Sequence, residues 1–125
     1  MNETVEIKER AGDGCVILDI QADNFTYPYT SVLKTSIADY LEQNKRFFVL
    51  NVGDIKIIDS YGLATIVSCL KLIHDQHGGM ALCGLNETFE KLVKLTHLDK
   101  VLEIWPSEAQ ATYYLSTLIK EAQPR

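Results

Sequence analysis

Two histidines in the second half of the chain are the first side chains whose spacing could support chemistry. His74 and His77 lie three residues apart, so both could approach one metal ion from the end of a helix. The potential third ligand beside them is Asp75, which points to another side of the helix. The helix dipole favours histidine at a helix carboxyl end, so a solvated helix end is the simpler interpretation. We therefore expect no metal and no cofactor.

The serine at position 60 lacks the sequence context of a hydrolase nucleophile. A Gly-x-Ser-x-Gly motif is absent, because Ile58 and Asp59 precede Ser60. The glycine-rich phosphate loops of dinucleotide-binding proteins and nucleoside triphosphatases are absent as well. Since no set of side chains has a catalytic pattern, the sequence predicts a protein that is not an enzyme.

The cysteines indicate a reducing environment. Cys15, Cys69 and Cys83 are far apart, odd in number and set among apolar residues. This usage predicts reduced, buried thiols in a cytoplasmic protein, because disulfides are rare in that compartment. A nucleophilic cysteine is the minor alternative.

The segment from position 57 to position 63 stands out from the rest of the chain. Asp59 and Ser60 are both favourable N-cap residues, and they precede the most apolar helical pattern in the sequence. The plain interpretation is a helix cap, with Gly62 allowing close packing in the first turn. A functional role for the same residues is the alternative, and local chemistry alone leaves both open.

Size and composition are those of an ordinary single domain. The chain has 125 residues and a mass of 14.1 kDa, which suits one domain over residues 1–125. Its 12 Lys and Arg against 17 Asp and Glu give a formal net charge of −5, which argues against a nucleic-acid partner. No apolar run reaches the roughly 18 residues of a membrane span, so no membrane insertion is expected. The charged residues 1–10 fit neither a signal peptide nor a transit peptide.

Apolar patterns predict the strands. Residues 5–9 and 15–20 alternate between apolar and polar, and the glycine-containing turn over 11–14 joins them into a hairpin. The continuous apolar run over 47–52 is typical of a strand covered on both faces by helices. Further strands are expected over 80–84 and 102–105.

Helical periodicity fills the segments between these strands. A first helix is expected over 28–44, with Pro28 as its first residue and Tyr29 and Val32 on its inner face. A second helix begins near Ser60, and the Gly78-Gly79 pair ends it.

Capping signals mark the last two helices. Asn86 caps a short helix, and Ser107 opens a terminal helix with Gln110 at the capping-box spacing. The resulting alternation of strands and helices predicts an α/β layer structure with a largely parallel sheet after the opening hairpin.

The residues from Ile58 to Leu63, Ile-Asp-Ser-Tyr-Gly-Leu, resemble the signature of STAS domains, the fold of anti-sigma factor antagonists. The resemblance extends across nearly the whole chain, because the hairpin, the first helix, the strand over 47–52 and the segments 96–101 and 104–109 fall in register. It implies a mixed, mostly parallel sheet of four to five strands with about four helices packed mainly on one side.

The resemblance also implies a bacterial signalling switch in transcription regulation. In partner-switching pathways the unmodified antagonist binds an anti-sigma factor, a serine kinase of the histidine-kinase-like ATPase fold. Phosphorylation of the motif serine releases the antagonist, and a metal-dependent serine phosphatase resets it. The matching serine here is Ser60, with Asp59 as its acidic neighbour, so the resemblance implies a cytoplasmic phosphoprotein.

Two positions depart from the family pattern. Tyr61 stands where a second Ser or Thr is common, and either partner contact or core packing would suit an aromatic residue there. Asn51 occupies the place of an Asp at the end of the strand before the motif. Neither departure changes the expected fold.

We expect the partner-binding surface to surround the start of the second helix. It should include that helix's exposed flank and the loop after the second strand, because these segments are expected at one end of the sheet. The expected residues are Asp23, Asn24, Asp59, Ser60, Tyr61, Gly62, Thr65 and Ser68.

A second role within the family stays open. A STAS subunit without a phosphorylation cycle could bind the ATPase of a lipid-transport ABC complex, and such a subunit also keeps a Ser or Thr at the helix start. The tail of an anion transporter is a third role, which the initial Met1 and the full terminal helix disfavour.

Overall fold

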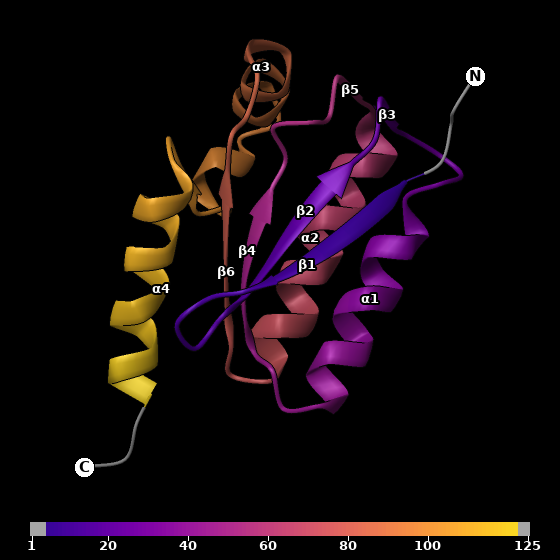
Figure 1. Ribbon diagram of the computed structural model, residues 1–125. Coiled ribbons are helices and arrows are strands. Elements are labelled where there is room, and N and C mark those ends of the chain that lie inside the picture. Colours follow the sequence, from indigo (N-terminus) through magenta and orange to yellow (C-terminus); the bar gives the residue numbers. More distant parts are fainter. Residues whose placement is uncertain (1–4, 123–125) are drawn as a thin grey trace.

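A five-stranded mixed sheet forms the centre of the protein. The computed structural model describes residues 5–122. The strands are β1 (Glu6–Ala11), β2 (Val16–Gln21), β4 (Phe47–Asn51), β6 (Gly79–Cys83) and β7 (Ile104–Trp105), in the order β1-β2-β4-β6-β7. β1 and β2 form the expected antiparallel hairpin, and every later pair is parallel (Figure 1).

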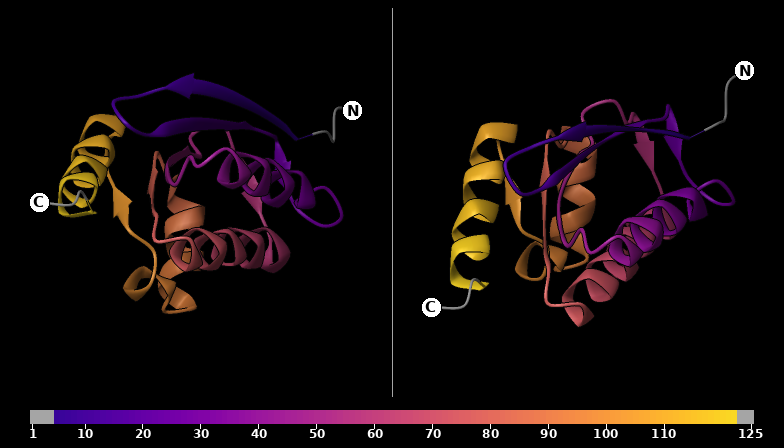
Figure 2. Two further views of the ribbon diagram at one scale, coloured as in Figure 1. Left: turned by 90° about the horizontal axis from the view of Figure 1, so that it is seen from below. Right: turned by 60° about the horizontal axis from the view of Figure 1, so that its bottom comes forward.

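Helices cover both faces of this sheet unequally. On one face lie α1 (Ser31–Glu42), α2 (Ser60–Asp75) and α3 (Glu87–Leu95), and the short helix η1 (Leu98–Lys100) follows α3. On the other face α4 (Glu108–Ala122) packs alone, and Figure 2 shows it apart from α1 and α2. Alternate residues of β2 point to the two layers, because Leu18 lies in the core beneath the first three helices and Ile17 in the core beneath α4. The α/β fold expected from the sequence is confirmed.

A second, very short sheet was not expected from the sequence. β3 (Asn24–Phe25) pairs in parallel with β5 (Ile57–Ile58), where the sequence predicted only loops. The carbonyl of Asp23 also accepts hydrogen bonds from the backbone N–H groups of Lys56 (3.2 Å) and Ile57 (2.9 Å). This pairing fixes the chain immediately before α2 at one end of the molecule (Figure 1).

Two expected helix boundaries are wrong. Pro28 does not begin α1, because residues 27–30 form a turn in which the N–H of Tyr29 donates to the carbonyl of Thr26 (2.9 Å). Gly78 and Gly79 do not end α2, since Gln76 is already its C-cap and His77 takes the left-handed conformation with φ of 62°. Gly79 instead begins β6.

The capping predictions for the last two helices are confirmed. Asn86 Oδ1 accepts a hydrogen bond from the N–H of Phe89 at 2.8 Å. Ser107 Oγ accepts from the N–H of Gln110 at 3.2 Å and donates to the Gln110 side chain at 3.1 Å. Both caps satisfy N–H groups that a helix leaves without partners in its first turn.

An ion-pair network joins the sheet to α4. Arg10 on β1 donates to both carboxylate oxygens of Asp19 on β2, at 2.6 and 2.8 Å, and its guanidinium also donates to Glu108 on α4. Asn51 on β4 donates to Asp19 at 2.9 Å. The hydrogen bonds from Arg10, helped by the one from Asn51, hold the pKa of Asp19 below its usual range, although partial burial opposes them.

We expect this network to make stability fall in acid. A carboxyl group with a lowered folded-state pKa stabilises the fold above its unfolded pKa of about 3.9 and loses that contribution as pH falls through the folded value. Since Arg10 is 45% exposed, solvent screening limits the loss to on the order of 1 kcal/mol. Urea unfolding from about pH 7 to about pH 2 should show a steeper loss for the wild type than for Asp19→Asn.

The exposed Asp39 on α1 supplies the control for this comparison. Asp39→Asn should lose stability in acid as steeply as the wild type. Identical pH dependence in Asp19→Asn and the wild type would contradict the prediction.

Candidate functional site

Asp59 fixes the beginning of α2. It is the N-cap of the helix, with an extended backbone, and its Oδ1 accepts a hydrogen bond from the N–H of Gly62 at 2.8 Å. Its Oδ2 accepts from the N–H of Tyr27 at 3.2 Å. One carboxylate therefore ties the first turn of α2 to the segment that precedes α1.

Ser60 is left out of the capping arrangement. It is the first residue of α2 and is exposed, and its hydroxyl has no hydrogen-bond partner among residues 5–122. Because Asp59 alone caps the helix, the plain interpretation as a cap explains Asp59 and does not explain Ser60. The hydroxyl lies at a helix N-terminus, where N–H groups and the helix dipole favour an added negative charge.

Gly62 brings α2 against the small sheet. A Cβ atom at this position would lie 2.3 Å from the carbonyl oxygen of Phe25 and 2.8 Å from Cγ1 of Ile58. Only a residue without a side chain permits this approach between the first turn of α2 and β3. The expectation of close packing at Gly62 is confirmed.

Two tyrosine rings lie on the surface beside Ser60. Tyr27 and Tyr61 have ring centroids 5.0 Å apart at an interplanar angle of 44°, and the residues are 67% and 59% exposed. Core packing, the alternative for Tyr61, is therefore excluded. Tyr29 and Val32, expected on the inner face of the first helix, are also exposed, as is Ile57 on β5.

The remaining expected surface residues are distributed unevenly. Asp23 is exposed and its side chain lies 3.4 Å from Lys56 Nζ, while Asn24 pairs with Ile57 in the small sheet. Thr65 and Ser68 are half-buried rather than exposed, and the Thr65 hydroxyl donates to the carbonyl of Tyr61 at 3.0 Å.

Exposed residues on the outer face of α2 are instead Ser60, Ala64 and Lys71. Residues 23, 24 and 59–61 thus do gather at one end of the molecule, while Thr65 and Ser68 contribute little exposed surface. Sequence reasoning missed Tyr27, since nothing in a single sequence indicates that its N–H reaches Asp59.

Asn51 has a structural position at the carboxyl end of β4. Its Nδ2 donates to Asp19 at 2.9 Å, and its Oδ1 accepts from the N–H of Gly53 at 3.1 Å. The side chain thus joins the ends of β2 and β4 and shapes the loop that leads to β5.

The cysteines do not form part of a reactive site. All three are free and buried, and burial raises the pKa of Cys69 to about 12 and that of Cys83 to about 11. The prediction of buried, unpaired thiols is confirmed. Because a protonated thiol is a poor nucleophile, the raised pKa values disfavour a reactive cysteine.

The part of the chain that the structure describes, residues 5–122, gathers no group of three or more His, Cys, Asp or Glu side chains suited to a metal ion. It also contains no helix that combines the length and apolar character needed to cross a membrane.

The sequence is similar to those of proteins named as anti-sigma factor antagonists. A Thermotoga maritima protein provisionally named an anti-sigma factor antagonist is 40% identical over 68 residues, which cover 54% of this chain and 58% of that relative. The anti-sigma F factor antagonist of Paenibacillus polymyxa is 26% identical over 112 residues, 89% of this chain and 93% of the relative.

Solved structures point to the same family. The crystal structure of a Thermotoga maritima protein, also provisionally named an anti-sigma factor antagonist, has a TM-score of 0.76 at 27% identity and covers 88% of this chain and 94% of that one. The family model described as "STAS domain" matches residues 5–111. The chain therefore belongs to the STAS domain family.

Proposed function

We propose that this protein is an anti-sigma factor antagonist of a bacterial partner-switching pathway, controlled by phosphorylation of Ser60. The unmodified form binds an anti-sigma factor that is also a serine kinase, and phosphorylation ends this binding. A metal-dependent serine phosphatase restores the active form. The protein acts in the cytoplasm as a regulator and not as an enzyme. The observation that carries the proposal is the exposed, unbonded Ser60 hydroxyl beside the contacting rings of Tyr27 and Tyr61.

The local structure supports reversible modification. The hydroxyl contributes no hydrogen bond within residues 5–122, so its modification removes no described contact. A phosphate of about −1.5 to −2 charges at a helix N-terminus is accommodated by the dipole of α2. The cap is Asp59, whose two hydrogen bonds do not involve Ser60. We therefore expect the modified domain to stay folded.

The same phosphate changes the charge of the surface that a partner would bind. Asp59 already carries a negative charge next to Ser60, so phosphorylation gives this pair a total of about −2.5 to −3. A surface fitted to a neutral hydroxyl would then face like charges and the cost of removing water from them. Phosphorylation should consequently act on the interface and not on the fold.

Phosphopeptide mapping of the protein purified from its native cells tests the proposal. The phosphate should be found on the peptide containing Ser60 and should disappear in Ser60→Ala. Ser31→Ala is a matched control, because Ser31 is also an exposed serine at the first position of a helix. A phosphate that maps to Ser31, or an unmodified Ser60 under every growth condition, would contradict the proposal.

The tyrosine pair is expected to anchor the partner. Exposed aromatic side chains are frequent hot spots in interfaces, and two rings that already contact each other lose little freedom on binding. Tyr61→Ala should weaken binding to the anti-sigma kinase by about tenfold, and Tyr27→Ala by a similar factor. Isothermal titration calorimetry with the purified kinase measures both changes.

Tyr113 provides the control for this prediction. It is 73% exposed on α4, on the opposite side of the sheet. Tyr113→Ala should leave the affinity unchanged. Equal affinities for all three variants and the wild type would remove the tyrosine pair from the interface.

A further inference from the structure

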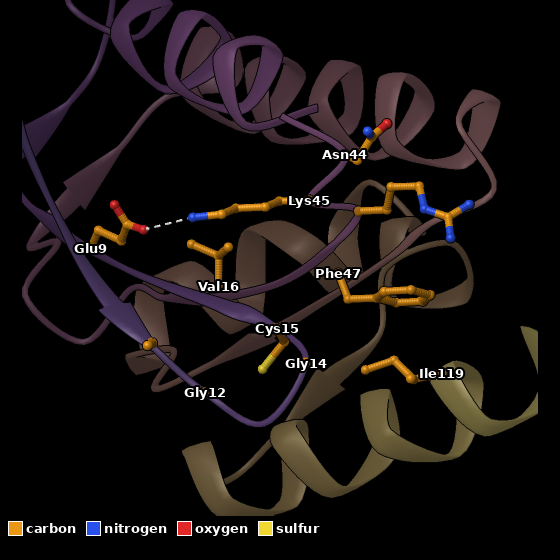
Figure 3. A pocket seen from close by; sticks show the side chains of 11 residues that line it. Glu9, Gly12, Gly14, Cys15, Val16, Asn44, Lys45, Phe47 and Ile119 are labelled. Carbon is orange, nitrogen blue, oxygen red and sulfur yellow. Dashed lines mark hydrogen bonds and ion pairs between the residues drawn. The ribbon is translucent and has the colours of Figure 1, made fainter. Parts of the chain in front are cut away.

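A hollow in the surface lies away from Ser60. A pocket of about 450 Å³ opens where β2 and β4 begin, whereas Ser60 follows the other end of these strands. The β1–β2 turn, the loop before β4 and the last turns of α4 surround it (Figure 3). Its volume lies in the range of small-molecule sites, about 300–1,000 Å³.

Apolar side chains form the inner wall of this pocket. Val16 and Phe47 are buried at the beginnings of β2 and β4, and Ile119 of α4 packs against the same core as Phe47. Cys15 completes the wall, and burial raises the pKa of its thiol, so the thiol stays uncharged. The wall therefore suits a compact apolar group.

The rim carries charges that are only loosely paired. Lys45 Nζ lies 3.5 Å from Glu9 and its side chain is 44% exposed. Arg46 donates to the carbonyl of Gln76 at a distance of 3.5 Å. Glu9 makes a shorter hydrogen bond with Tyr40, whose hydroxyl donates to the Glu9 carboxylate at 2.6 Å. Figure 3 shows Lys45 extending towards Glu9 across the pocket above Val16.

The charges of the lining give the pocket a sign opposite to that of the whole protein. Lys45 and Arg46 against Glu9 leave one net positive charge, in a chain whose formal net charge is −5. Long contacts between exposed charges are weak, so a better-placed anion can displace them. A cation would meet net repulsion here, and a neutral ligand would gain less from the two basic side chains than an anion, because it would accept only hydrogen bonds without charge attraction.

We propose that this pocket binds a small organic monoanion, with a carboxylate or a phosphate diester at Lys45 and an apolar body against Val16, Phe47 and Ile119, while Arg46 adds to the positive charge of the rim. Such a ligand combines the two features of the lining. The site is separate from the surface around Ser60, so ligand binding and partner binding can be measured independently.

An NMR titration of the full chain with naphthoate tests the proposal. Amide signals of Gly12, Gly14, Cys15 and Phe47 should shift and saturate, and naphthylmethanol, the neutral analogue, should bind about tenfold more weakly. Two singly charged diesters, dimethyl phosphate and methyl cyclohexylmethyl phosphate, distinguish a bare anion from one with an apolar body. Methyl cyclohexylmethyl phosphate should bind more tightly, and equal affinities for the two diesters would contradict the proposed apolar contact.

Charge variants give opposite expected changes. The double variant Lys45→Gln, Arg46→Gln should weaken naphthoate binding by about tenfold, and Glu9→Gln should strengthen it a few-fold by releasing Lys45. Lys34→Gln, at an exposed lysine of α1, should leave it unchanged. Equal binding of naphthoate and its alcohol, shifts confined to residues outside the pocket, or unaltered affinity in the double variant would overturn the proposal.

Discussion

Gly62→Ala should lower the free energy of unfolding by roughly 2 kcal/mol or more, although alanine is the better helix former. The new methyl group would lie 2.3 Å from the carbonyl oxygen of Phe25, which belongs to the backbone and cannot rotate away. The first turn of α2 would have to move off β3, and the hydrogen bond of Asp59 to this turn would be disturbed. Urea denaturation monitored by circular dichroism measures the loss.

Gly53→Ala makes the same chemical change nearby and serves as the control. Gly53 is exposed in the loop after β4, and its Cβ would lie 3.3 Å from a side-chain oxygen of Asn51. We expect this variant to differ from the wild type by less than about 1 kcal/mol. If Gly62→Ala were as stable as Gly53→Ala, the close approach of α2 and β3 would not exist in solution.

Ser60→Glu should weaken binding to the anti-sigma kinase by about a hundredfold or more while leaving the fold intact. A hundredfold loss corresponds to about 2.7 kcal/mol, within the range expected for a buried, uncompensated charge in an interface. Stability should be unaffected, because glutamate in the first turn of a helix interacts favourably with its dipole. Calorimetry with the kinase and urea unfolding of the variant separate the two effects.

Ser31→Glu is the matched control, since it places the same charge at the start of α1. This variant and Ser60→Ala should both retain the kinase. Capture from native lysate with unmodified protein and with Ser60→Glu distinguishes the roles open to the family. A histidine-kinase-like protein retained by the unmodified protein and not by Ser60→Glu supports the phosphorylation switch. A transporter ATPase retained equally by the two proteins would identify a fixed subunit and contradict the switch.

The layer structure was predictable because it follows from periodicity alone. The continuous apolar run that includes Phe48 and Leu50 is typical of a strand covered on both faces, and the regular apolar spacing after Ser60 is typical of an amphipathic helix. These signals are local, and the structure confirms them.

Other features depend on residues far apart in sequence and could not be predicted in this way. The pairing of β3 with β5 joins two-residue segments more than thirty positions apart, too short to show a strand pattern. The contact between Tyr27 and Asp59 is equally remote, and it lies at the turn that precedes α1, where Pro28 suggested a helix. The sequence therefore predicted a candidate site at Ser60, but it did not indicate that Tyr27 lies beside it.

The two borders of the main sheet limit how these molecules can associate. β1 forms one border and exposes Glu6, Lys8, Glu9 and Arg10, whereas β7 at the other border has only two residues. A strand docking beside β1 would have to bury charges of both signs. A strand docking beside β7 could form only the few backbone hydrogen bonds that a two-residue strand offers. Growth into fibrils by lateral strand addition is thus opposed at both ends, even at high protein concentration. Strand addition to this sheet is therefore a poor route to association, and contacts through side chains of helices and turns are favoured over it.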